Sequence, residues 1–297
     1  MADSTSITDD FTLNLLHELR AGAYRPRSWA RFFVRSWAHS RAFAAAHPPL
    51  TASWLGVAAA LTLAQAGALV GVAGRLGPRR TLGVALALAP LHTWTLVDTW
   101  AHLSMNAPAR DAAPAETLGL PNHLTLARRG LADHLWARIL AGAPVAGPTA
   151  LAILLVGGGA DILDGALARS TQRQTRLGAY LDATADAEFW LALAATLTLT
   201  RRLPAWLGAL LAARFFAPFA AALAAYFGLL ARLPLGSTGV GKAAGVAQAL
   251  VVAEASAPQS LRQRTAPLRP ALRAGAAVLL LLAPLSQVAR LRRLRLP

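Results

Sequence analysis

The chain has 297 residues, of which 55% are hydrophobic and only 14% are charged, and its mean hydropathy is +0.44. Soluble domains carry about a quarter charged residues, so this composition excludes an ordinary soluble protein and predicts an all-α, polytopic transmembrane helical bundle. The absence of cysteine excludes disulfides and thiolate chemistry. Because the arginines behind the net charge of +15 flank apolar segments, we expect contact with the lipid bilayer and no nucleic acid partner.

Residues 1–48 are predicted to form a cytosolic or interfacial segment. They begin with acidic residues and contain no basic stretch before an apolar core, so no cleavable signal peptide is expected. Within residues 28–46, one helical face gathers aromatic side chains and the other gathers arginines. These are Trp29, Phe32, Phe33, Trp37 and Phe43 on one side, and Arg31, Arg35 and Arg41 on the other. This pattern is typical of an amphipathic helix in the membrane interface; a cap packed on the protein's own cytosolic side is the alternative.

Residues 49–118 are predicted to form a two-helix transmembrane extension followed by a linker. A spanning helix needs roughly 20 apolar residues, and residues 50–74 and 82–104 meet this length. Asp98 lies within the second segment, and we expect it to face the bundle because charged groups in spans are costly. Residues 105–120, rich in Ala, Pro and polar side chains, are predicted to be the linker.

Residues 119–297 are predicted to form a six-helix core. Its apolar segments are 124–142, 146–168, 178–199, 204–230, 242–256 and 272–289. If both chain ends and the loop at 170–177 are cytoplasmic, the cytoplasmic segments hold more arginine and lysine than the outer loops. This distribution favours that orientation in the cell membrane.

Two pairs of aspartates distinguish residues 161–186. Asp161 and Asp164 are three apart, and Asp182 and Asp186 are four apart, so each pair shares a helical face. The polar residues 170–177 predict a turn between two antiparallel helices, which would bring the four carboxylates together. Because the pairs adjoin uncharged apolar runs, a functional site is favoured over a solvated helix face.

Carboxylates in this arrangement suit hard divalent cations. Mg²⁺ prefers oxygen ligands and shares its coordination with substrate phosphates. The four aspartates therefore predict a site for two Mg²⁺ or Mn²⁺ ions that also binds something bulky and anionic.

The stretch also resembles a known family. It reads Asp161-x-x-Asp164-Gly165-x-x-Ala168-Arg169, then eight residues, then Gly178-x-x-x-Asp182-x-x-x-Asp186. This is similar to the signature of the CDP-alcohol phosphatidyltransferases, integral membrane enzymes of phospholipid synthesis, with every signature position filled. Upstream, Pro121-Asn122, Leu124-Thr125 and Arg128 resemble the start of the family's first core helix.

The resemblance implies a reaction and roles for these residues. A phosphatidyl group would pass from CDP-diacylglycerol, or a similar CDP-alcohol, to an acceptor hydroxyl with release of CMP. Asp161, Asp164 and Asp182 would bind metal, and Asp186 would be both a metal ligand and the general base. Gly165, Ala168 and Gly178 would leave room for the cytidine end of the donor, and Arg169 would contact its phosphates; tight helix packing is the alternative role for the small residues. The family also implies six core helices and a homodimer.

Two basic residues are candidates for binding the acceptor. Lys242 follows Gly241, similar to a Gly-Lys turn in family members that use glycerol 3-phosphate or inositol phosphate. Arg214 lies within an apolar segment, where an arginine usually faces a cavity or a partner. For both, snorkelling to the water interface is the alternative, and serine and phosphatidylglycerol stay open as acceptors.

Three other functions compete with this interpretation. Another Mg-pyrophosphate membrane transferase would also use aspartate pairs, but the Gly-Ala-Arg continuation has no reason to occur there. A non-catalytic scaffold would be favoured by a missing aspartate, and none is missing. A transporter would be favoured by an internal repeat, and the sequence has none that we detect.

Overall fold

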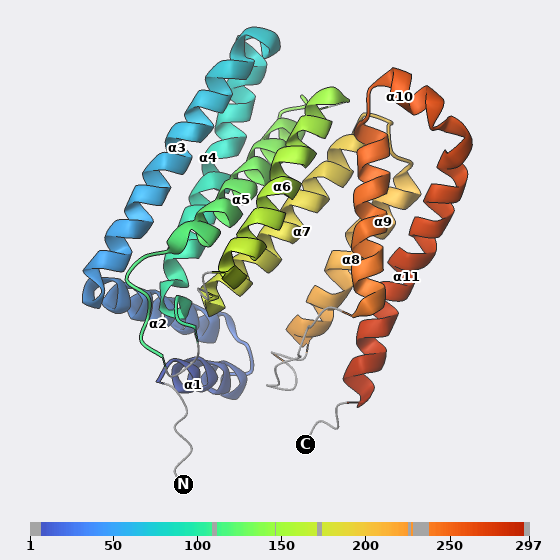
Figure 1. Ribbon diagram of the computed structural model, residues 1–297. Coiled ribbons are helices and arrows are strands. Elements are labelled where there is room, and N and C mark those ends of the chain that lie inside the picture. The colour runs from blue at the N-terminus through green and yellow to red at the C-terminus, as the bar shows by residue number, and fades with distance from the viewer. Residues whose placement is uncertain are drawn as a thin grey trace. The chain divides into compact units, whose positions relative to one another are not determined.

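The computed structural model describes residues 7–108, 112–145, 147–170, 174–224, 227 and 238–293 (Figure 1). Within these residues the fold is all-α, as predicted, and contains no strand. The helices are α1 (Ile7–Ala21), α2 (Pro26–Ala46), α3 (Pro48–Leu76), α4 (Pro78–Ala101), η1 (Leu103–Met105), α5 (Gly119–Leu140), α6 (Pro148–Ser170), α7 (Arg176–Leu199), α8 (Ala205–Ala224), α9 (Gly239–Ser256), α10 (Gln259–Arg264), η3 (Ala266–Leu268) and α11 (Arg269–Arg293).

Proline and glycine set several of these boundaries. Pro26, Pro48 and Pro78 stand in the first turn of α2, α3 and α4, where the missing N–H costs nothing because it would have no partner in the helix. Gly77 ends α3 with φ of +75°, a conformation that disfavours residues with a Cβ. The chain therefore reverses within one residue between α3 and α4.

Four helical stretches are long and apolar enough to cross a membrane, among the residues that the structure describes. They are Pro48–Leu76, Pro148–Ala168, Ala205–Ala224 and Ala266–Ser286. Large apolar side chains point outward on them, such as Leu63, Val70, Phe216 and Phe219, each more than half exposed. The chain is therefore an integral membrane protein. The other predicted spans correspond to helices α4, α5, α7 and α9, and that these helices cross the membrane stays a prediction. Of the predicted segment 204–230, residues 225–226 and 228–230 lie outside the described part.

The chain divides into two compact units. The first comprises Met1–Ala141 and Gly157–Glu188, and the second Gly142–Val156 and Phe189–Pro297. This division cuts α6 and α7 and does not test the predicted domain boundaries at residues 48 and 118, which stay predictions.

A hydrophobic cluster joins the N-terminal extension to α5 and α7 in the first unit. It consists of Leu50, Val57, Leu103, Leu118, Leu126, Leu177 and Leu181. A smaller cluster of Val84, Leu88 and Ala137 packs α4 against α5. Burial of this apolar surface therefore holds the extension onto α5 and onto α7, the helix that carries Asp182 and Asp186.

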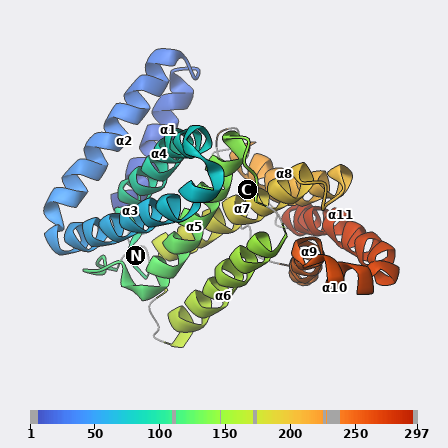
Figure 2. The same ribbon diagram turned by 90° about the horizontal axis from the view of Figure 1, so that it is seen from above.

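Helices α1 and α2 lie side by side, across the end of the α3–α4 hairpin (Figures 1 and 2). Glu18 of α1 pairs with Arg35 of α2. The Trp37 ring lies 4.7 Å from that of Trp100 at the end of α4, whereas Phe33 is 61% exposed. The predicted helix over residues 28–46 is thus present as α2, with one aromatic side chain packed on the protein and another outward; its place in a membrane interface stays a prediction.

In the second unit, α11 packs on both α8 and α9. The Thr238 side chain caps α9 by accepting from the Gly241 N–H at 3.0 Å, and its hydroxyl lies 2.7 Å from that of Ser286 on α11. At the other end of α9, Glu254 pairs with Arg269, the first residue of α11. Polar contacts therefore anchor α11 to both ends of α9.

Candidate active site

Three helices of the first unit contribute to the aspartate site. The C-terminal half of α6 carries Asp161 and Asp164, and the N-terminal half of α7 carries Asp182 and Asp186. Helix α5 adds Arg128, which lies three residues after Thr125, nearly one helical turn. The polar stretch before Arg176 separates α6 from α7, and its residues 171–173 lie outside the described part of the chain.

Arg128 is the centre on which the four carboxylates converge. Its side chain is 1% exposed. Nη1 donates to Asp161 and, at 2.5 Å, to Asp186; Nη2 donates to Asp182 at 2.6 Å and lies 3.9 Å from Asp164. The structure thus brings all four predicted residues to one guanidinium.

The four carboxylates differ in exposure. Asp164 is buried and accepts a hydrogen bond from the Thr125 hydroxyl at 2.8 Å. The side chains of Asp161, Asp182 and Asp186 are 43%, 51% and 38% exposed. The Asp164 carboxylate is therefore held by a hydrogen bond from α5, while the other three carboxylates are accessible to a ligand from solvent.

The donor set fits divalent cations. Asp161, Asp182 and Asp186 each offer an oxygen, and these oxygens lie within 4.8 Å of one another. Four carboxylates face a single guanidinium, so the cluster has a local excess of negative charge. Partly buried charges of one sign are costly unless they are compensated, and oxygen ligands at this spacing are those that Mg²⁺ or Mn²⁺ prefers.

A cavity of about 220 Å³ adjoins the aspartates. It is lined by Pro121, Asn122, Thr125, Asp164, Gly165, Ala168, Gln174, Thr175, Gly178, Ala179 and Asp182. All three predicted small residues, Gly165, Ala168 and Gly178, therefore lie on the same cavity as two of the aspartates. Arg169 follows Ala168 in α6, but its side chain lies outside the described part of the structure.

Gly178 also meets the packing requirement that was the alternative role for the small residues. A Cβ at this position would lie 2.9 Å from Oδ1 of Asn122 and 3.3 Å from Oγ1 of Thr175. A real Cβ is essentially never found 2.9 Å from another heavy atom, so a larger residue at this position would displace the Asn122 side chain of α5. The absence of a side chain at Gly178 thus serves both the close approach of α7 to α5 and the space in the cavity.

A second polar cluster lies beside the first and involves Asp98, Arg129 and Glu188. The Arg129 side chain is 2% exposed; Nη1 donates to Asp98 at 2.6 Å, and Nε and Nη2 donate to Glu188 at 2.7 and 2.9 Å. The Tyr180 hydroxyl donates to Asp98 at 2.8 Å. Asp98 thus faces inward, as predicted, and Glu188 binds Arg129 and not the guanidinium at the centre of the aspartates.

Three residues of α5 take part in the site without an assigned role in the sequence interpretation. From the sequence, Asn122, Thr125 and Arg128 were recognised only as a match to the start of the family's first core helix. In the structure they contact the aspartates or lie against Gly178. The signal that could have found them is their three-residue spacing, which puts an amide, a hydroxyl and a guanidinium along one side of a helix.

The two candidate acceptor residues lie in the second unit. Arg214 of α8 donates to Oε1 of Gln248 on α9, and its Nη2 lies 3.4 Å from the Gly241 carbonyl oxygen. Lys242 follows Gly241 in the first turn of α9 and is exposed. The structure therefore brings Arg214 close to the turn that carries Lys242.

Comparison with known proteins adds two findings. The family model of the CDP-alcohol phosphatidyltransferases matches residues 118–284, more than half of the chain. A cardiolipin synthase (CMP-forming) from Streptomyces coelicolor (strain ATCC BAA-471 / A3(2) / M145) is 39% identical over 93 residues, which are 30% of this chain and 43% of that protein. The similarity thus spans less than half of the relative's length. No solved structure matches the chain.

Proposed function

Because the chain belongs to the CDP-alcohol phosphatidyltransferase family, we propose that it transfers a phosphatidyl group from CDP-diacylglycerol, or a similar CDP-alcohol, to an acceptor hydroxyl and releases CMP. The observation that carries this proposal is the convergence of four aspartates beside a cavity lined by small residues. The reaction belongs to phospholipid synthesis and takes place at the membrane.

Asp161, Asp164, Asp182 and Asp186 are the proposed ligands of two Mg²⁺ or Mn²⁺ ions. When bound, such ions neutralise the charge of a pyrophosphate and of the departing phosphate. Thr125 holds Asp164 in a fixed orientation through its hydroxyl. Arg128 gathers the carboxylates so that they stay close together despite their mutual repulsion.

Asp186 is the proposed general base. A base must reach the acceptor hydroxyl directly or through one water molecule, and the Asp186 carboxylate is 38% exposed at the edge of the cluster. As Asp186 takes the proton, the acceptor oxygen bonds to the phosphorus of the phosphatidyl group, and the bond from that phosphorus to the oxygen of CMP breaks. Gly165, Ala168 and Gly178 leave space for the cytidine end, and Arg169 is the proposed contact for the donor's phosphates.

The proposed acceptor carries a phosphate group, as glycerol 3-phosphate, an inositol phosphate and phosphatidylglycerol do. Lys242 and Arg214 near the start of α9 are its proposed contacts, because two cations and a helix N-terminus favour an anion. Phosphatidylglycerol, which the sequence leaves open, is included among the acceptors to be tested. A cytoplasm-facing site, placement in the cell membrane and a homodimer complete the proposal.

The decisive experiment measures CMP release by the purified protein in detergent. CDP-diacylglycerol and Mg²⁺ or Mn²⁺ are supplied with each acceptor in turn, serine included. We expect CMP release that depends on one acceptor and falls by about 10³-fold in Asp186→Asn, within the range of general-base contributions.

The matched control is Glu116→Gln, which makes the same carboxylate-to-amide change at an exposed residue and should keep full activity. Folded protein that releases no CMP with any acceptor contradicts the proposal and favours a scaffold. Activity that survives in Asp186→Asn removes this residue from the chemistry.

A further inference from the structure

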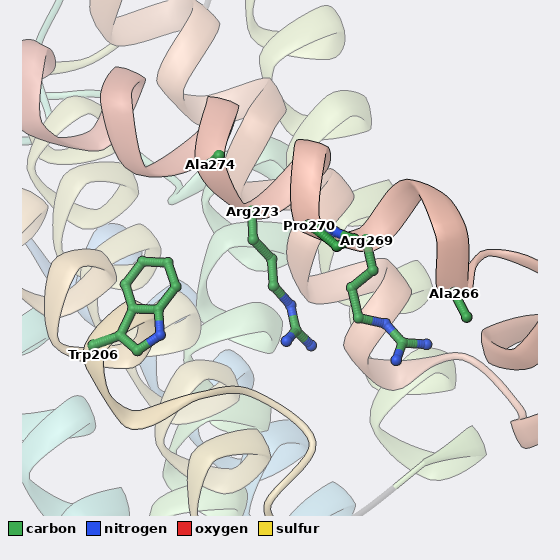
Figure 3. Close-up of a pocket in the computed structure, with 6 residues that line it drawn as sticks. All are labelled: Trp206, Ala266, Arg269, Pro270, Arg273 and Ala274. Atoms are coloured by element: carbon green, nitrogen blue, oxygen red, sulfur yellow. The ribbon is translucent and has the colours of Figure 1, made fainter.

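A second cavity, of about 430 Å³, lies in the second unit among arginines and a tryptophan. It is lined by Trp206, Ala266, Arg269, Pro270, Arg273 and Ala274 (Figure 3). These residues come from the first turn of α8, from η3 and from the first turns of α11. None of them belongs to the aspartate site or to its signature.

Positive charge exceeds negative charge around this cavity. Glu254 is the one carboxylate that contacts these arginines among the described residues. Its Oε1 lies 2.7 Å from Nε of Arg269 and 3.6 Å from Nε of Arg262, and its Oε2 lies 3.8 Å from Nη2 of Arg273. Three guanidinium groups therefore share one carboxylate, and the cluster retains a net positive charge.

Some hydrogen-bond donors of this cluster are also unsatisfied. Nε of Arg262 and Nε of Arg273 are buried and have no hydrogen-bond partner. A guanidinium offers five N–H donors in a rigid fork, and a phosphate offers several acceptor oxygens that match it. Arg269 and Arg273 line the cavity, so an anion with several oxygens there would compensate the charge of the cluster.

The cavity lies where two candidate spans begin. The stretch Ala205–Ala224 starts one residue before Trp206, and Ala266–Ser286 starts at a lining residue of the cavity. Trp206 is 52% exposed, and tryptophan is enriched where the apolar core of a bilayer meets the headgroups. If these two stretches cross the bilayer, the arginines of the cavity lie at the level of the lipid phosphates.

We propose that this cavity is a binding site for a phosphate group, the chemistry that an anionic phospholipid headgroup and a free phosphate ion have in common. Arg269 and Arg273 bind the phosphate oxygens, and Trp206 packs against the ligand at the bilayer boundary. Glu254 positions Arg269 and lowers the affinity by competing for its guanidinium. The site does not depend on the proposed transferase reaction.

The experiment measures lipid binding by native mass spectrometry of the full chain, loaded with phosphatidylglycerol or phosphatidylcholine. A second arm titrates inorganic phosphate into protein freed of lipid. We expect Arg269→Gln/Arg273→Gln to weaken phosphatidylglycerol binding by at least about ten-fold, since each basic residue near a membrane surface contributes appreciably to the attraction of anionic lipid. The matched control Arg79→Gln/Arg80→Gln removes two exposed arginines elsewhere and should leave this binding unchanged.

Glu254→Gln gives a test in the opposite direction, which a folding defect cannot imitate. Removal of the competing carboxylate should tighten phosphate binding by at least about three-fold, in line with the attraction between one charge pair near a protein surface. If only the lipid binds in an arginine-dependent way, the headgroup is the ligand; if inorganic phosphate binds as well, the free ion is recognised too. Equal binding by the wild type and the double glutamine variant overturns the proposal. If the double variant does not fold, unchanged or weaker binding in Glu254→Gln overturns it.

Discussion

Arg128 shows how much of the site depends on one buried side chain. It comes from a helix separate from those of the aspartates, 33 residues before Asp161 and 58 before Asp186. A guanidinium in this place screens the repulsion among carboxylates that would otherwise push α6 and α7 apart. The Arg128 guanidinium is itself a cation, so the carboxylate cluster already binds one positive charge without metal.

Replacement of Arg128 by glutamine should therefore destabilise the protein without metal by about 3 kcal/mol, because removal of one partner leaves charges uncompensated. Added Mg²⁺ should recover more stability in this variant than in the wild type, since the ions compensate the same carboxylates. The measurement is thermal unfolding with and without Mg²⁺. Arg75→Gln, at an exposed arginine, is the control and should respond as the wild type does.

An equal Mg²⁺ response in Arg128→Gln and in the wild type would contradict this role. It would mean that the guanidinium does not hold the carboxylates in the arrangement that cations need.

At the scale of elements, the contacts of α4 are the notable result. This helix lies outside the range that the family model matches, which begins at residue 118. Its Asp98 nevertheless accepts hydrogen bonds from Arg129 on α5 and from Tyr180 on α7. Tyr180 precedes Asp182 by two residues, so the extension is tied to the helix that carries half of the aspartates.

Asp98→Asn should for this reason destabilise the protein by about 3 kcal/mol, because it breaks a buried ion pair with Arg129. If CMP release is measured as proposed above, kcat should fall, since α7 carries Asp182 and Asp186 and shifts when Tyr180 loses its contact with Asp98. Thermal unfolding and steady-state kinetics check both effects.

The control for this variant is Glu18→Gln, which breaks the pair between Glu18 and Arg35, with side chains 51% and 49% exposed. Exposed pairs contribute at most about 1 kcal/mol, so its stability should stay close to that of the wild type. Similar losses of stability in both variants would show that the buried contacts of Asp98 stabilise the protein no more than an exposed ion pair does.

At the scale of the whole molecule, the proposed function couples cation binding to stability. A ligand that binds only the folded state at a hundred times its Kd adds about 2.7 kcal/mol to the free energy of unfolding. Removal of divalent ions with EDTA should therefore lower the midpoint of thermal unfolding and abolish CMP release, and Mg²⁺ or Mn²⁺ should restore both.

Asp182→Asn provides the comparison, because it removes one of the three oxygens that lie within 4.8 Å of one another. The stabilisation by Mg²⁺ should shrink in this variant. If Mg²⁺ stabilises Asp182→Asn as much as the wild type, the ions bind elsewhere and the proposed metal site is wrong.

The sequence by itself determined the features that arise from local periodicity. Apolar runs predicted helices because a chain in lipid must satisfy its backbone hydrogen bonds within each segment. The three- and four-residue spacing of Asp161, Asp164, Asp182 and Asp186 placed each pair on one helical face, and Asp98 was expected inside the bundle because a charge in lipid is costly. The family was recognisable from the same spacing.

Only the tertiary structure decided which faces of different helices meet. Arg128 lies among the aspartates, Arg129 pairs with Asp98 and Glu188, and Gly178 allows α7 to approach Asn122. The partners in these contacts are separated by many residues along the chain, so no helical period relates them. Their choice follows from how packed helices bury apolar surface and compensate buried charge at the same time, which is a property of the assembled bundle and not of any one segment.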